Sequence, residues 1–162
     1  MKILYFDSFS ILYSANYLNC HDAVRERFEN QKPFRSTDIL LSSVEPDKES
    51  AKKLAQAARE ANLLLYPIGT RFTRELLIKH NVFSDAQLAP FVDLTWRMRP
   101  DDRDPIRRMF KHASVLDAQW FVCGEAACDE RLKSFPNRYF ESEWGEAVSD
   151  ELVSKIIATA AY

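Results

Sequence analysis

The chain has 162 residues, of which 46% are apolar and 28% are charged, and its formal net charge at pH 7 is -2. This length and composition exclude a disordered, repetitive or collagen-like chain and fit one domain with its own core. The net charge excludes an overall basic field of the kind that attracts nucleic acid. We therefore expect a single domain over residues 1–162.

The cysteines and the N-terminal segment predict a cytoplasmic location. Cys20, Cys123 and Cys128 form an odd set without the density of a secreted disulfide framework. The apolar run at the N-terminus stops at Asp7, before it reaches the length of a signal-peptide core. No segment is long and apolar enough to predict a membrane span.

The first third of the chain begins with a predicted strand over residues 2–6, an apolar run that ends at Asp7. Residues 22–29 predict a short helix and residues 30–36 a loop. Residues 39–41 are expected to form a small strand or a packing segment.

A strong helical pattern covers residues 46–61, where alanines and leucines recur at helical spacing and lysines face away. The helix leads directly into residues 63–66, a predicted buried strand that ends near Gly69. A strand, a helix and a second strand in this order predict a parallel crossover.

The rest of the chain continues this alternation, with its strongest strand over residues 120–123, before Gly124. The alternation predicts a three-layer α/β, Rossmann-like fold with a mainly parallel sheet. The other predicted elements are helices over residues 73–80, after Ser84, over 105–112 and over 150–161, and strands over 92–98 and 138–140.

The residues that follow the strong strands are the first candidates for a site, because ligands of open parallel sheets bind beyond the carboxyl ends of the strands. Asp7 follows the first strand, and Gly69 and Gly124 follow the other two. An aspartate held by a buried strand can serve as a nucleophile or a magnesium ligand, or it can simply be a solvated turn residue. The glycines either make sharp turns or allow close approach of a ligand.

Residues 5–12, Tyr-Phe-Asp-Ser-Phe-Ser-Ile-Leu, resemble the first motif of the haloacid-dehalogenase-like (HAD-like) phosphohydrolases, in which two aspartates stand two positions apart. The resemblance extends over most of the chain, towards the small HAD-like domains that lack a cap. It implies a HAD-like fold with Asp7 as the nucleophile and as a magnesium ligand.

Three further positions match this family in order and spacing. Thr70 resembles the hydroxyl residue that closes the second motif and holds phosphate, with Tyr66 as the poorer alternative. Arg103, before a helix, resembles the basic residue that stabilises the phosphoryl charge, with Arg99 in reserve. Glu125 resembles an acidic magnesium ligand of the fourth motif.

The fourth motif departs from the family pattern, because Cys123 and Gly124 stand where it usually begins with aspartate. Asp129 is a second candidate for the acidic ligand. The resemblance therefore implies a magnesium site formed by Asp7 and Glu125, which would be weak without phosphate oxygens.

The first motif also departs from the pattern, because Phe9 stands where phosphatases place the aspartate that protonates the leaving group. The haloalkanoic-acid dehalogenases also carry an aromatic residue there, since a halide leaves without a proton. Those enzymes use a cap domain, for which this chain has little spare length.

Two other patterns are weighed and not favoured. Cys123, Cys128, His80 and His112 do not form the paired spacing of a zinc site. Trp96 lies near six basic residues that could contact RNA, but neighbouring aspartates dilute their charge, and a solvated helix face is the preferred interpretation. The six are Arg97, Arg99, Arg103, Arg107, Arg108 and Lys111.

The departures favour a HAD-like pseudoenzyme that serves as a binding or regulatory protein, whose partner would be a phosphorylated small molecule or another protein. The alternative is a magnesium-dependent hydrolase of phosphorylated substrates, and an RNA-associated module ranks third. In each case Asp7, Thr70, Arg103 and Glu125 are expected to converge at one edge of the sheet, because they adjoin strands predicted to be parallel.

Overall fold

Four short strands form an all-parallel sheet in the order β2-β1-β3-β4. The computed structural model describes residues 1–159. Its strands are β1 (Lys2–Phe6), β2 (Leu64–Pro67), β3 (Gln119–Cys123) and β4 (Tyr139–Phe140). The α/β fold and the parallel sheet that the sequence predicts are therefore confirmed, and the fold is compatible with a Rossmann-like architecture.

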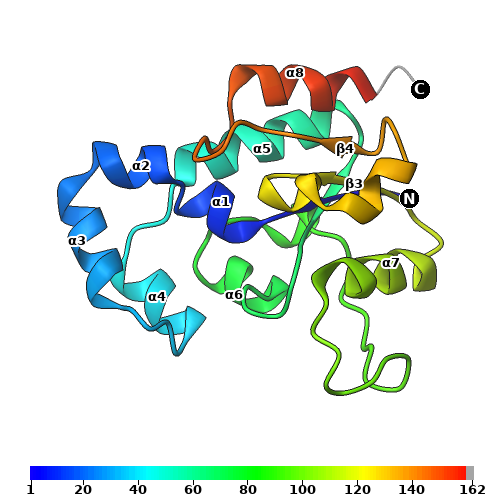
Figure 1. The fold of residues 1–162 in the computed structure, drawn as a ribbon, viewed down its shortest axis with the longest axis horizontal. Coiled ribbons are helices and arrows are strands. Elements are labelled where there is room, and N and C mark those ends of the chain that lie inside the picture. The colour runs from blue at the N-terminus through cyan, green and yellow to red at the C-terminus, as the bar shows by residue number, and fades with distance from the viewer. Residues whose placement is uncertain (160–162) are drawn as a thin grey trace.

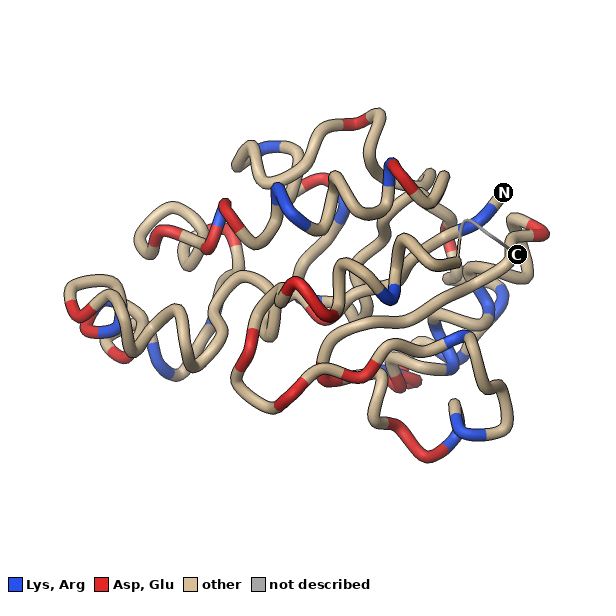
Figure 2. Tube along the Cα trace, turned by 90° about the horizontal axis from the view of Figure 1, so that it is seen from above, with Lys and Arg blue, Asp and Glu red and all other residues tan. Residues whose placement is uncertain are grey.

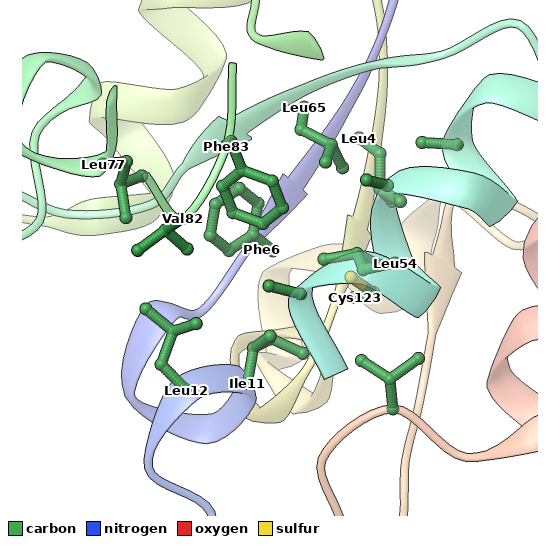
Figure 3. Packing of buried hydrophobic residues seen from close by; sticks show 14 of the residues in the cluster. Leu4, Phe6, Ile11, Leu12, Leu54, Leu65, Leu77, Val82, Phe83 and Cys123 are labelled. Carbon is green, nitrogen blue, oxygen red and sulfur yellow. The ribbon is translucent and has the colours of Figure 1, made fainter. Parts of the chain in front are cut away.

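The central strand β1 is buried on both faces. Leu4 and Phe6 belong to the larger apolar cluster, part of which Figure 3 shows, and Ile3 and Tyr5 belong to a second cluster on the other face. All four side chains are at most 1% exposed. Burial on both faces explains why this strand is a continuous apolar run and does not alternate with polar residues.

The helices cover the two faces of the sheet as separate layers (Figure 1). Buried residues of α5 (Lys48–Glu60) and α8 (Asp150–Ala158) belong to the larger cluster. Buried residues of α7 (Pro105–Val115) belong to the second cluster. The fold therefore has three layers, helices, sheet and helices, and β1 is one of the two inner strands of the sheet.

Most of the helices begin at a residue whose side chain caps the helix N-terminus. Asp47, Asp104 and Ser149 each accept a hydrogen bond from the first turn of the helix that follows, which satisfies backbone N–H groups that have no partner within the helix. The other helices are α1 (Ser8–Leu12), α2 (Ala15–Cys20), α3 (Asp22–Asn30), α4 (Thr37–Ser43) and α6 (Arg74–Lys79), with 3₁₀ turns at Asp85–Gln87, Glu125–Cys128 and Glu130–Ser134.

Two predicted elements differ in the structure. Residues 39–41 lie inside α4, because Ser36 caps this helix and its buried Leu40 and Leu41 lie on one helical face. Residues 92–98 form an irregular segment with a turn over 95–97, and not a strand, and Trp96 is almost fully exposed. Two short helices, α1 and α2, fall where no element was predicted.

The predicted C-terminal helix is present as α8, and residues 160–161 of that prediction lie outside the described residues. Within residues 1–159, no helix has the length and apolar character required to cross a membrane.

Leu54 tests the packing of α5 against the sheet, because its side chain is 0% exposed. We expect Leu54→Ala to lower the free energy of unfolding by about 2–5 kcal/mol, since it leaves a cavity in the larger cluster. Urea denaturation measures the loss. The matched control is Lys52→Ala on the exposed side of α5, which we expect to change stability by less than about 0.5 kcal/mol. Equal effects of the two variants would contradict this packing.

Candidate functional site

The candidate site lies at the carboxyl ends of β1 and β3, the two central neighbours of the sheet. The chain leaves β1 to return as β2 on one side, and it leaves β3 to return as β4 on the other. A crevice forms in α/β sheets at such a switch point, where connections depart in opposite directions. Asp7 and Glu125 follow these two strands.

Asp7 caps α1 with its side chain. Its Oδ1 accepts hydrogen bonds from the backbone N–H of Phe9 (3.1 Å) and of Ser10 (3.4 Å). These bonds hold one carboxylate oxygen against the helix start, and Oδ2 has no recorded hydrogen-bond partner among residues 1–159. The side chain is therefore fixed in direction by its own backbone.

Ser10 links the two strand ends. Its buried hydroxyl donates to the backbone carbonyl of Asp7 (3.0 Å) and accepts from the backbone N–H of Glu125 (3.4 Å). Because one side chain contacts both loops, the position of Glu125 relative to Asp7 depends on it. Ser10 was not predicted as a site residue, and the one sequence signal for it is its place three residues after Asp7, in the segment that resembles the first HAD motif.

Gly124 allows the two loops to approach closely. A Cβ atom at this position would lie 2.8 Å from Ser10 Oγ and 3.3 Å from Asp7 Cβ. Its backbone has φ 88° and ψ -165°, a conformation found almost only at glycine. Gly124 is therefore required both for the turn and for the contact with the Asp7 segment.

The electrostatics of the site are those of two neighbouring acids. Burial raises the pKa of Asp7, and the backbone N–H groups of Ser10 and Phe9 lower it in part. Burial and the charge of Asp7 both raise the pKa of Glu125. The charge of Asp7 therefore makes ionisation of Glu125 harder. Burial, with a contribution from Asp7, also raises the pKa of Cys123.

Two carboxylates at adjacent strand ends are a donor set that a hard divalent cation accepts. Magnesium in particular is often held by one or two carboxylates, with substrate phosphate and water completing its shell. Among residues 1–159 no group of three or more His, Cys, Asp or Glu side chains is arranged to hold a metal ion. These two carboxylates alone would leave most of a cation's coordination shell to water and to ligand oxygens.

Thr70 lies at the same edge of the sheet but lines a cavity on the α7 side of it. It is exposed in the loop that follows β2, and the cavity that it lines includes neither Asp7 nor Glu125. Phe72 of this loop packs edge-on against Phe9, with ring centroids 4.8 Å apart. The loop therefore contacts α1 through aromatic rings, while Thr70 lines the cavity on the α7 side.

Arg103 is exposed in the segment before α7, and among residues 1–159 it has no recorded hydrogen bond or ion pair. Within this part of the chain no lysine or arginine forms an ion pair with Asp7 or Glu125. Arg99, the reserve candidate, is also exposed. The structure thus brings the segments that carry Asp7 and Glu125 into contact and shows no contact that brings Arg103 to them.

The remaining alternatives have other partners. Asp129 caps a 3₁₀ turn and pairs with Arg131 at 2.9 Å, and the ring of Tyr66 stacks on His112. Cys123 is buried while Cys128 is exposed.

The basic stretch near Trp96 is partly neutralised by its neighbours. Arg107 pairs with Asp102 at 2.9 Å and also lies 3.5 Å from Asp104. Asp104 in turn pairs with Arg131 at 2.6 Å. Positive and negative residues are interspersed along most of the trace (Figure 2). These pairs favour the solvated-face interpretation of this stretch over an RNA interface.

Gly124→Ala tests the close approach of the two loops, with Gly69→Ala as its control. Both glycines have φ of +88°, so both variants carry backbone strain of about 1–3 kcal/mol. Only Gly124→Ala adds steric overlap, since nothing lies within 4 Å of a Cβ at Gly69. We expect Gly124→Ala to lose at least about 1 kcal/mol more in urea denaturation. Equal losses would mean that the loops do not meet as described.

Asp7→Asn tests the cost of burying the Asp7 charge. Since burial raises the pKa of Asp7 in the folded chain, its contribution to stability is fully present below the unfolded pKa of about 3.9 and is lost as the pH rises through the folded pKa. Asparagine keeps the cap without the charge. We expect Asp7→Asn to be more stable than the parent chain at pH 7, with a gain that disappears in more acidic solution.

Urea denaturation across this pH range measures the effect, and exposed Asp101→Asn is the control. If Asp7→Asn were less stable than the parent chain at pH 7, the charge would be stabilised in the fold and not penalised by it.

Comparison of this chain with protein-family models, with curated proteins and with solved structures found no match.

Proposed function

We propose that this chain is a HAD-like domain that binds a ligand or partner and does not hydrolyse phosphate esters efficiently. The resemblance of residues 5–12 to the first HAD motif is supported by the place of Asp7, at the end of the central strand β1. The place of Glu125 supports it as well, because this residue follows the neighbouring strand β3. Both acids lie where such a domain would use them.

The observation that carries this proposal is the packing of Phe9. This ring occupies the position at which a phosphatase would place its proton donor, and it lies 4.8 Å from Phe72 and 5.7 Å from Phe34, measured between ring centroids. An aromatic ring within an apolar cluster supplies no proton to a leaving group. The general-acid step, which contributes about 10²–10⁴-fold where it operates, is missing.

The surroundings of Asp7 add a second argument. A phosphoryl group transferred to this carboxylate would need a cation to balance its charge. Arg103, the residue expected in that role, makes no recorded contact with Asp7 or Glu125 among residues 1–159. Phe9 replaces the proton donor, and Arg103 does not contact Asp7. Both features favour ligand binding over catalytic turnover.

A phosphatase assay tests the proposal. We expect the chain to hydrolyse glycerol phosphate, whose alkoxide must gain a proton as it leaves, with magnesium no faster than its Asp7→Asn variant, because neither a proton donor nor a nearby cation assists the reaction. Phosphate release measured by absorbance gives the comparison. Efficient turnover by the parent chain that Asp7→Asn abolishes would overturn the pseudoenzyme assignment.

The pairing of Asp7 with Glu125 favours a second candidate, a magnesium-dependent hydrolase of activated phosphate esters. Asp7 Oδ2 would attack phosphorus, and the ester oxygen would leave with the bonding electron pair, unprotonated because Phe9 has no proton to give. Water would then cleave the aspartyl phosphate. A bound magnesium ion would supply charge neutralisation, held by Asp7 and Glu125. This candidate gains support from turnover of p-nitrophenyl phosphate, an activated ester, with magnesium, and loses it if Glu125→Gln leaves that turnover unchanged.

A further inference from the structure

A cavity of about 170 Å³ lies on the α7 face of the sheet, separate from the two carboxylates. Its walls come from the ends of β1 and β2, from the loop after β2, from residues 91–94 and from α7. Phe91 lines it and is 71% exposed, so this ring lies at the mouth. Neither Asp7 nor Glu125 contributes to the lining.

The floor of the cavity is aromatic and held by hydrogen bonds. His112 Nε2 lies 2.9 Å from the carbonyl of Pro90, and His112 Nδ1 lies 2.7 Å from the hydroxyl of Tyr5. Because a carbonyl only accepts, Nε2 donates, and Nδ1 of the neutral ring accepts from Tyr5. Burial lowers the pKa of His112, which agrees with a neutral ring. Tyr66 stacks on this histidine with ring centroids 3.9 Å apart.

The charge of the cavity is positive. Two arginines, Arg74 and Arg108, line it, and no Asp or Glu of the described chain does. Arg74 is already neutralised, since its guanidinium donates to Asp85 at 2.6 Å and to the carbonyl of Ala89 at 2.8 Å. Arg108 has one recorded bond, from Nη1 to the carbonyl of Asp102 at 3.3 Å. Its Nε and Nη2 therefore remain able to donate to a ligand.

Two hydroxyl groups complete the polar side of the cavity. Thr70 and Thr73 both line it. Thr73 Oγ1 accepts from the backbone N–H of Leu76 (3.2 Å), which leaves its own hydrogen available to a ligand. The lining thus combines one cationic donor and two hydroxyl donors with the rings of Tyr66 and Phe91.

We propose that this cavity binds a small, flat organic anion of single-ring size, with its acid group on Arg108 and its ring against the aromatic wall. Arginine presents a planar pair of donors that matches the two oxygens of a carboxylate or phosphonate. The volume sets the size of the ligand, because a cavity of about 150 Å³ accommodates benzene. Thr70, expected from the sequence to hold phosphate, would donate to the same acid group.

The small organic anion is a ligand class for the binding role proposed under Proposed function. Its assignment rests on that role only in part. The cavity contains no residue of the Asp7–Glu125 pair, so the phosphatase assay and a binding measurement on the cavity are separate experiments. A failure of either leaves the other result intact and identifies which proposal was wrong.

The test is a titration of the full chain with benzoate, followed by amide chemical shifts, with benzamide as the uncharged ligand of the same shape. We expect benzoate to bind in the millimolar range or more tightly, to shift the amides of Thr70 and Thr73, and to exceed benzamide in affinity. Arg108→Met should weaken benzoate binding by about tenfold or more, because it removes a charge-assisted hydrogen bond.

Lys111→Met is the matched control, since Lys111 lies on the same helix, is exposed and does not line the cavity. It removes the same charge and should leave benzoate binding within about twofold of the parent chain, as expected for a screened surface charge. Equal affinity for benzoate and benzamide would overturn the proposal. So would an equal effect of the two variants, or no benzoate binding at tens of millimolar.

Discussion

The burial of β1 on both faces is the constraint on which the rest of this structure depends. The side chains of its last four residues, 3–6, divide between two apolar clusters. Helices must therefore cover both sides of the sheet. A strand in this position has neighbours on both edges, and its carboxyl end opens between two loops. Asp7 is the residue at that end. Its partial burial, its raised pKa and its closeness to Glu125 all follow from the place of one strand.

The two sides of the sheet offer different chemistry at the same edge. Between β1 and β3, Ser10 and Gly124 hold two acids close together, with an apolar ring where a proton donor would be useful. Beside β2 and α7, a neutral histidine lies against a cavity in which Arg108 keeps free N–H donors. On the proposed assignments, the acidic pair would hold a cation and the cavity would hold an anion, at separate places on one domain.

The strong strands were predictable because each is a continuous apolar run that ends in a turn residue, and this local pattern survives in the fold. The acids at their ends were predictable for the same reason, since parallel strands place their carboxyl ends together. The helices α1 and α4 were not predictable from periodicity. They have only five and seven residues, and tertiary packing of Ile11, Leu12, Leu40 and Leu41 stabilises them more than local propensity does.

The sequence by itself determined the α/β class, the parallel strands and the neighbourhood of Asp7 and Glu125, because these depend on short apolar patterns and on strand direction. Only the tertiary structure decided which basic residue faces a cavity. Arg103 and Arg108 stand five positions apart and look alike in sequence, but the first precedes α7 in solvent while the second lies on the turn of α7 that faces Tyr66. The physical reason is that a cavity is formed by side chains far apart in the chain, so its lining depends on packing and not on local pattern.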